Sequence, residues 1–213
     1  MKILAIDLSK TNTGFAFGSA GAKPSFGTVK FGGVTFGPDD DFRDGWRRVE
    51  AWLTAIIESF RPDAIWCEAP PRPGSFGGAT NAENTLWIVG AWAALCLTAG
   101  RHSIMWREAN VKSVRMEFVG SASLDSALAK KEAKRVCLQL GWKPANLDEA
   151  DAGAVFYCAG LALAPSLMPS VKDFRYRRIG DDGAVSFKPP PKKTRARSRS
   201  EAVFRPIRNI RGK

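Results

Sequence analysis

The chain has 213 residues, 45% of them hydrophobic, and a formal net charge of +11. This length suits one domain with a single core, since domains commonly run to about 100–200 residues. The apolar stretches at 86–99 and 152–165 are too short for a transmembrane helix, and no cleavable leader pattern opens the sequence. The four cysteines are far apart and form no CxxC pair, which argues against a zinc site. We therefore expect a soluble intracellular protein with no membrane partner.

The positive charge is concentrated near the C-terminus. Residues 172–213 hold 14 Lys and Arg against 4 Asp and Glu, and the rest of the chain is nearly neutral. This segment has too little apolar content to fold alone, and its charge would attract a polyanion. We expect a domain over 1–168 and a basic, disordered nucleic-acid-binding tail over 169–213, with a solubility tail or sorting signal as the alternative. The candidate contacts in the tail are Lys192, Lys193, Arg195, Arg197 and Arg199.

The first third of the chain predicts three strands and a helix. Turn-forming residues separate the apolar segments, which favours an antiparallel meander with strands at 2–8, 13–19 and 26–35. Apolar residues at helical spacing then predict a helix over 42–60.

The remaining two thirds predict two further strands and four helices. The strands are expected at 63–68 and 103–106, and the helices at 81–99, 109–118, 129–141 and 148–163. The loop over 69–80 is rich in Gly and Pro. This order of elements predicts an α/β fold, with a five-stranded mixed sheet flanked by helices on both faces.

Four acidic residues occupy positions where a folded domain could bring their carboxylates together. Asp7 and Glu68 close two apolar strand segments, and Asp148 and Asp151 share one face of a helix start. Such a cluster suits Mg²⁺, a hard ion that takes oxygen ligands and keeps some water for chemistry. The alternatives are polar residues that end a strand and, for Asp148, a helix cap.

The order of these motifs resembles the ribonuclease H-like nucleases, and more closely the RuvC-type Holliday junction resolvases. Asp7 followed by Thr13-Gly14 is similar to the opening of that family, and Glu68 stands at its strand-end glutamate. The remaining similarities are Asn81-Ala82 with Leu86 and Gly90, Val111-Lys112, Lys131, and the closing Asp148-Glu149-Ala150-Asp151-Ala152. The sequence departs from the family where Asp7-Leu8-Ser9 replaces Asp-Pro-Gly and in its long basic tail, which points to a divergent, phage-type branch.

The resemblance implies an endonuclease that resolves four-way DNA junctions by paired symmetric nicks. It implies a homodimer formed through the helix of Trp87 and Trp92, in the cytoplasm of a bacterial or phage-infected cell. Two Mg²⁺ ions, which Mn²⁺ could replace, would be held by Asp7, Glu68, Asp148 and Asp151. The candidate nucleic-acid contacts in the domain are Thr13, Phe76, Asn81, Lys112 and Lys131, of which Lys131 is also a candidate catalytic residue.

Several alternatives remain open on the sequence alone. Lys131 could belong to a solvated helix face, and Phe76 could pack within its own loop instead of wedging between bases. The substrate could be a flap, a fork or an RNA–DNA hybrid. The chain could also be a non-catalytic nucleic-acid-binding module. A sugar kinase of the actin-like type would need two such domains, for which this chain is too short.

Overall fold

A computed structural model of the chain describes residues 1–32, 42–70 and 82–175. The chain divides into two units, Met1–Tyr176 and Arg177–Lys213, and all the described residues lie in the first. Residues just beyond the predicted boundary at 168 still pack on this unit, because Val171 is buried and the Tyr157 hydroxyl donates a hydrogen bond to the Pro169 carbonyl oxygen at 3.0 Å. The nucleic-acid-binding tail stays a prediction.

The described residues form a five-stranded mixed sheet in the order β3-β2-β1-β4-β5. The meander pairs antiparallel, whereas β1, β4 and β5 are parallel. The strands are β1 (Lys2–Asp7), β2 (Thr13–Ser19), β3 (Ser25–Val29), β4 (Ala64–Glu68) and β5 (Met105–Ala109). Strand β1 is therefore central, which explains why Ile3 to Ile6 are all fully buried.

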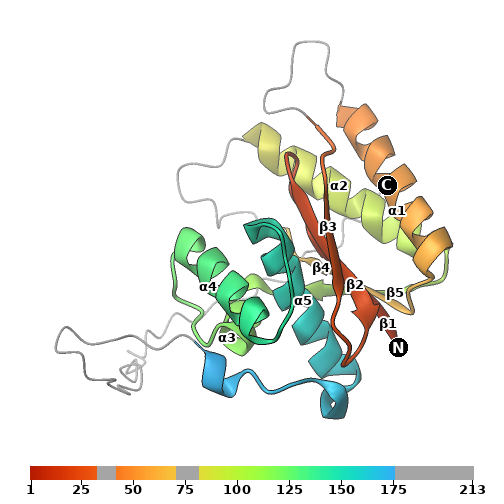
Figure 1. Cartoon of the computed structure of the whole chain (residues 1–213). Helices are drawn as coiled ribbons and strands as arrows, with labels where there is room; N and C mark the ends of the chain where they lie inside the picture. Colours follow the sequence, from red (N-terminus) through yellow and green to blue (C-terminus); the bar gives the residue numbers. More distant parts are fainter. Residues whose placement is uncertain (33–41, 71–81, 176–213) are drawn as a thin grey trace, which may run out of the picture. The chain divides into compact units, whose positions relative to one another are not determined.

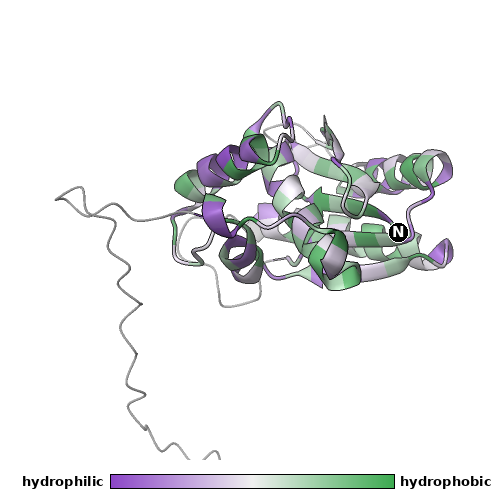
Figure 2. Cartoon of the chain, turned by 60° about the horizontal axis from the view of Figure 1, so that its bottom comes forward, coloured by the Kyte–Doolittle hydropathy of each residue, from purple (hydrophilic) through white to green (hydrophobic). Residues whose placement is uncertain are grey.

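Helices cover both faces of the sheet, as Figure 1 shows. Helices α1 (Phe42–Phe60) and α2 (Ala82–Arg101) pack on one face, against Leu4 and Ile6. The opposite face, which carries Ile3 and Ala5, is covered by α3 (Val111–Phe118), α4 (Ser126–Gln139) and α5 (Leu147–Leu163). Hydrophobic residues are concentrated in the strands and on the helix sides that face them (Figure 2). The predicted α/β fold is confirmed.

Short 3-10 turns, η1 (Pro165–Leu167) and η2 (Lys172–Phe174), follow α5.

Most predicted elements lie within a few residues of the observed ones. Helix α4 begins earlier than predicted because the Asp125 side chain caps it by accepting a hydrogen bond from the Leu128 N–H. Strand β3 ends before residues 31 and 32, whose N–H groups donate to the Lys10 carbonyl oxygen. In the described part of the chain, no helix is long and apolar enough to span a membrane.

Candidate active site

Asp7 and Glu68 end two neighbouring parallel strands. The ladder between β1 and β4 pairs Ile6 with Cys67, so the two acids follow this pair at the same edge of the sheet. In open α/β sheets, functional groups gather outside the carboxyl ends of the strands. The sheet thus brings together two of the four predicted acids.

Helix α5 brings the other two acids to this edge. Gly14 pairs with Asp7 in the β1–β2 ladder, and a Cβ on Gly14 would lie only 2.2 Å from the Asp148 carbonyl oxygen. The absence of a side chain at Gly14 therefore lets the first turn of α5 approach the strand that pairs with Asp7.

A capping box fixes the start of α5. The Asn146 side chain accepts a hydrogen bond from the Glu149 N–H at 2.9 Å, and the Glu149 carboxylate accepts one from the Ala145 N–H at 2.6 Å. Asn146, and not Asp148, is thus the cap, which leaves the Asp148 carboxylate free to face the site. Glu149 is only 6% exposed because of this role.

The ammonium of Lys130 lies among three of the carboxylates. Its Nζ is 3.6 Å from Asp7 Oδ2, 2.7 Å from Asp148 Oδ1 and 3.2 Å from Asp151 Oδ2. These side chains are between 13% and 29% exposed, so the ion pairs are partly shielded from water. Since Lys130 comes from α4, it joins this helix to the sheet edge and to α5.

Lys131, the predicted basic residue of the site, is exposed and makes none of these ion pairs. The physical reason is the orientation of α4, which buries Ala129 and Ala133. Lys130 lies beside that buried side, and Lys131 is turned about 100° further round the helix toward solvent. The position that reaches the carboxylates is Lys130, which sequence reasoning missed.

The other predicted contact residues have different outcomes. Thr13 is fully buried, and its hydroxyl donates to the Ser9 carbonyl oxygen at 2.5 Å and accepts from the Ser9 N–H at 3.0 Å. It therefore shapes the β1–β2 turn and is not open to a nucleic acid, contrary to the prediction. Lys112 is exposed at the start of α3. Phe76, Asn81 and the tail residues Lys192, Lys193, Arg195, Arg197 and Arg199 lie outside the described residues.

The electrostatics of the site show surplus negative charge. Burial, reinforced by Asp151, raises the pKa of Asp7 to about 7, although Lys130 partly offsets this. Burial and the charges of Asp7 and Asp151 raise the pKa of Glu68 to about 8. One lysine thus compensates the cluster only in part.

Asp151 and Asp148 differ in their surroundings. Burial raises the pKa of Asp151. Partial burial acts in the same direction on Asp148, but hydrogen bonds from Lys130 and from the Asn12 side-chain amide outweigh it and lower the pKa of Asp148. The carboxylates also raise the pKa of Lys130, overcoming the opposite effect of burial. Lys130 is therefore held as a cation against Asp148.

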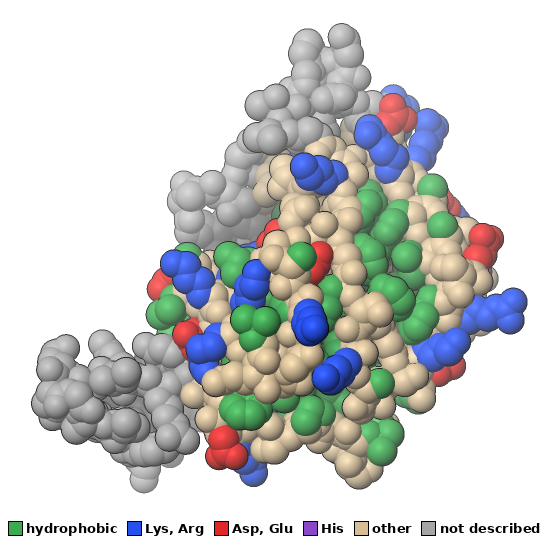
Figure 3. Space-filling model, in the orientation of Figure 1, with side chains coloured by type: hydrophobic (Ala, Val, Ile, Leu, Met, Phe, Trp, Pro, Cys, Tyr) green, Lys and Arg blue, Asp and Glu red, His purple; other side chains and the backbone are tan. Residues whose placement is uncertain are grey.

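The donor set fits a hard divalent cation, because four carboxylates with surplus charge supply oxygen ligands only. Among residues 1–32, 42–70 and 82–175, no three acidic, Cys or His side chains already stand as a metal-ligand group. Lys130 lies between the carboxylates instead. On the face of the molecule shown in Figure 3, acidic side chains lie among Lys and Arg.

The fold is that of the ribonuclease H-like nucleases, with the four acids at the edge where the central strands end. No protein-family model matches the sequence. The chain is 27% identical over 158 residues to the crossover junction endodeoxyribonuclease RuvC of Methylococcus capsulatus, an alignment that covers 74% of this chain and 88% of that protein.

Solved structures of RuvC have the same fold. Thermus thermophilus RuvC superposes with a TM-score of 0.54 at 20% identity, over 76% of this chain and 95% of that one. The same protein in complex with a Holliday junction substrate gives a TM-score of 0.56 at 22% identity, with the same coverage. The resemblance to RuvC-type resolvases that the motifs indicate is confirmed: this chain is related to them in sequence and in fold.

Proposed function

We propose that the protein is a metal-dependent endonuclease that resolves four-way DNA junctions by paired symmetric nicks. The observation that carries this proposal is the meeting of Asp7, Glu68, Asp148 and Asp151, drawn from three separate parts of the chain, at one edge of a RuvC-like sheet. The similarity to a crossover junction endodeoxyribonuclease supports the reaction, and the structure of a relative bound to a Holliday junction supports the substrate.

Asp7, Glu68, Asp148 and Asp151 would hold the metal, as two Mg²⁺ ions. When bound, these ions would activate the attacking water and stabilise the leaving 3′ oxygen. The protein's own contribution is to place the acids correctly. Asn12 orients Asp148 by donating a hydrogen bond to Oδ2, and the capping box fixes the helix turn that carries Asp148 and Asp151.

Lys130 has two roles in this proposal. Without a divalent cation, its ammonium holds three like-charged carboxylates at one place, because it contacts each of them within 3.6 Å. When a divalent cation neutralises those carboxylates, the ammonium is available to the scissile phosphate and can stabilise the charge that develops there.

A homodimer would supply the two active sites that paired nicks on a two-fold junction require. The predicted interface helix, α2, presents an apolar stripe of Leu86, Val89 and Leu97, which are 54%, 41% and 62% exposed. These residues lie on one side of the helix. Trp87 is fully buried within the protomer, so the interface would use this stripe rather than Trp87. Leu97→Glu should give monomers in sedimentation experiments, whereas glutamate at the exposed Ala55 of α1 should not.

The function is tested with labelled four-way junction, flap, hybrid and linear duplex, in Mg²⁺, in Mn²⁺ and in EDTA. We expect symmetric nicking of the junction with either metal, none in EDTA, and none by Asp7→Asn. Metal-dependent cleavage of another substrate in preference to the junction would contradict the junction assignment. Tight junction binding with no cleavage under any condition would contradict the enzymatic assignment.

A further inference from the structure

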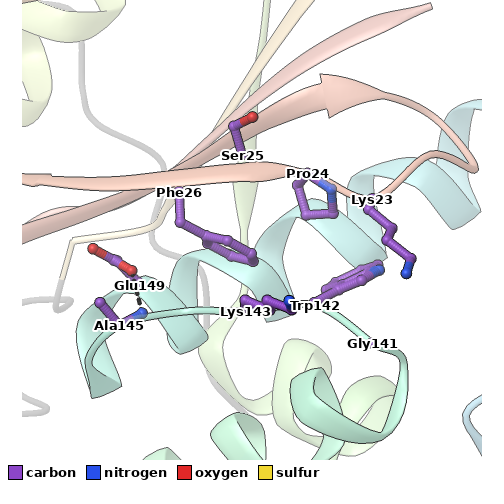
Figure 4. A pocket seen from close by; sticks show the side chains of 9 residues that line it. All are labelled: Lys23, Pro24, Ser25, Phe26, Gly141, Trp142, Lys143, Ala145 and Glu149. Carbon is purple, nitrogen blue, oxygen red and sulfur yellow. Dashed lines mark hydrogen bonds between the residues drawn. The ribbon is translucent and has the colours of Figure 1, made fainter.

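A pocket of about 570 Å³ lies beside the first turn of α5, apart from the four carboxylates. Its walls come from the turn and strand at Lys23 to Phe26 and from the connection between α4 and α5. Figure 4 shows the Phe26 and Trp142 rings on one side of this space, with Lys23 extending past Trp142 toward Gly141. Glu149, the neighbour of Asp148 in the chain, also lines the pocket.

The apolar wall of the pocket is rigid. Trp142 is 3% exposed, stacks on Phe118 with ring centroids 6.1 Å apart, and meets Phe156 edge-on at 5.9 Å. Pro24 is buried, and Phe26 packs against the same core. Phe26 is only half-buried, so its exposed part offers a fixed apolar surface that suits the sugar of a nucleotide.

Two exposed lysines, Lys23 and Lys143, lie at this wall. Gly141 has a positive φ of 72°, and a Cβ there would come within 3.1 Å of Lys23 Nζ, so the ammonium lies directly over this turn. Neither lysine forms an ion pair with an acidic side chain in the described part of the chain. A third cation, Lys134, donates to the Ala145 carbonyl oxygen at 2.8 Å and fixes the loop next to the lysines.

Among the described residues, Glu149 is the one acidic side chain that lines the pocket, so its single negative charge is outnumbered by the two lysines. Its Oε2 accepts from the Ala145 N–H at 2.6 Å and its Oε1 from the Asn146 amide at 3.4 Å, so both oxygens are engaged in the capping box. The pocket is therefore cationic and aromatic, and it opens next to the helix turn that carries two of the catalytic candidates.

We propose that this pocket binds a backbone phosphate of the bound nucleic acid, with Lys23 and Lys143 on the phosphate and the adjoining sugar against Phe26. The proposal rests on the proposed function, since it assigns the pocket to the same substrate. The pocket would hold a strand away from the cleavage point and so set how the junction arm lies across α5. Phosphate contacts of this kind fix the register of a nucleic acid without reading its sequence.

The test measures junction binding by full-length protein carrying Asp7→Asn, which separates binding from cleavage. Fluorescence anisotropy with a labelled four-way junction, over a series of salt concentrations, compares this parent with Lys23→Gln/Lys143→Gln. Each phosphate contact adds about 0.9 to the slope of log affinity against log salt. We expect the double variant to lower the slope by about 1 and to weaken binding roughly tenfold at low salt.

Two control variants separate charge from structure. Lys23→Arg/Lys143→Arg keeps both charges and should leave the salt slope unchanged. Arg47→Gln removes an exposed cation from α1, on the other face of the sheet, and should also leave the salt slope unchanged. An unchanged slope and affinity in Lys23→Gln/Lys143→Gln, with normal binding by the parent, would overturn the pocket alone. If the parent itself failed to bind the junction, both the pocket assignment and the proposed substrate would be overturned.

Discussion

Replacing Lys130 by Met removes the cation that contacts Asp7, Asp148 and Asp151 and leaves the hydrocarbon part of the side chain. Removing one member of a buried ion pair costs about 3–5 kcal/mol, because the remaining charge is left uncompensated. Lys130 is 29% exposed, so water recovers part of this cost, and we expect a loss of about 2–3 kcal/mol in the metal-free protein. For a domain of this size, the melting temperature should fall by about 4–12 °C.

The assay is thermal and urea unfolding in EDTA at about pH 8, where Asp7, with a pKa of about 7, is mostly ionised. Lys131→Met is the matched control, because its ammonium is exposed and makes none of these ion pairs. Exposed substitutions of this kind usually change stability by less than about 0.5 kcal/mol. Added Mg²⁺ should stabilise Lys130→Met more than the wild type, since the ion replaces the missing positive charge. Equal stability of the two variants in EDTA would refute the placement of Lys130 among the carboxylates.

Three other perturbations test the same geometry. Gly14→Ala places a Cβ 2.2 Å from the Asp148 carbonyl oxygen, so it should lower the free energy of unfolding, measured in urea, by more than about 2 kcal/mol. A decrease of less than about 0.5 kcal/mol would contradict the close approach of α5. Glu149→Ala removes the hydrogen bond that the Glu149 carboxylate accepts in the capping box, and it should lower the free energy of unfolding by about 1 kcal/mol. The control Glu58→Ala, on the exposed surface of α1, should leave the free energy of unfolding nearly unchanged. The pKa values of Asp7 and Glu68 are raised to about 7 and about 8, so the folded state binds more protons than the unfolded state between about pH 4 and 8. The unfolding free energy of the metal-free protein should therefore fall as the pH rises through this window. If the unfolding free energy measured in EDTA rose with pH instead, the raised pKa values of Asp7 and Glu68 would be contradicted.

The strand-end acids could be predicted because their positions follow from local patterns. Asp7 and Glu68 each close a short apolar run, and parallel neighbours bring such ends to one edge of the sheet. Asp148 and Asp151 are three residues apart, which places them on one side of α5. The capping box was missed, because Asp148 was the cap considered, although Asn146 and Glu149 have the spacing of that motif.

The lysine of the site could not be chosen in the same way. Lys130 and Lys131 are adjacent and chemically identical, and the choice depends on which side of α4 packs inward. That side is formed by Ala129, Ala133 and Val136, and its small residues give a weak apolar signal. The predicted start at 129 also missed the Asp125 cap, which fixes where α4 begins. Thr13 was assigned to DNA through the resemblance to the resolvases, and the sequence alone does not reveal that Ser9 satisfies its hydroxyl.

The convergence of the four acids depends on small residues as much as on the acids themselves. Ala5 and Ala16 are fully buried in the core that α5 shares with the sheet, and Gly14 has no side chain where the Asp148 backbone passes. Larger side chains there would push α5 outward and move Asp148 and Asp151, while Asp7 and Glu68 would stay on their strands. Lys130 would then lose part of its contacts, since it contacts acids from both groups. A related chain that keeps all four acids but carries larger residues at these positions should therefore not be assumed to keep the site.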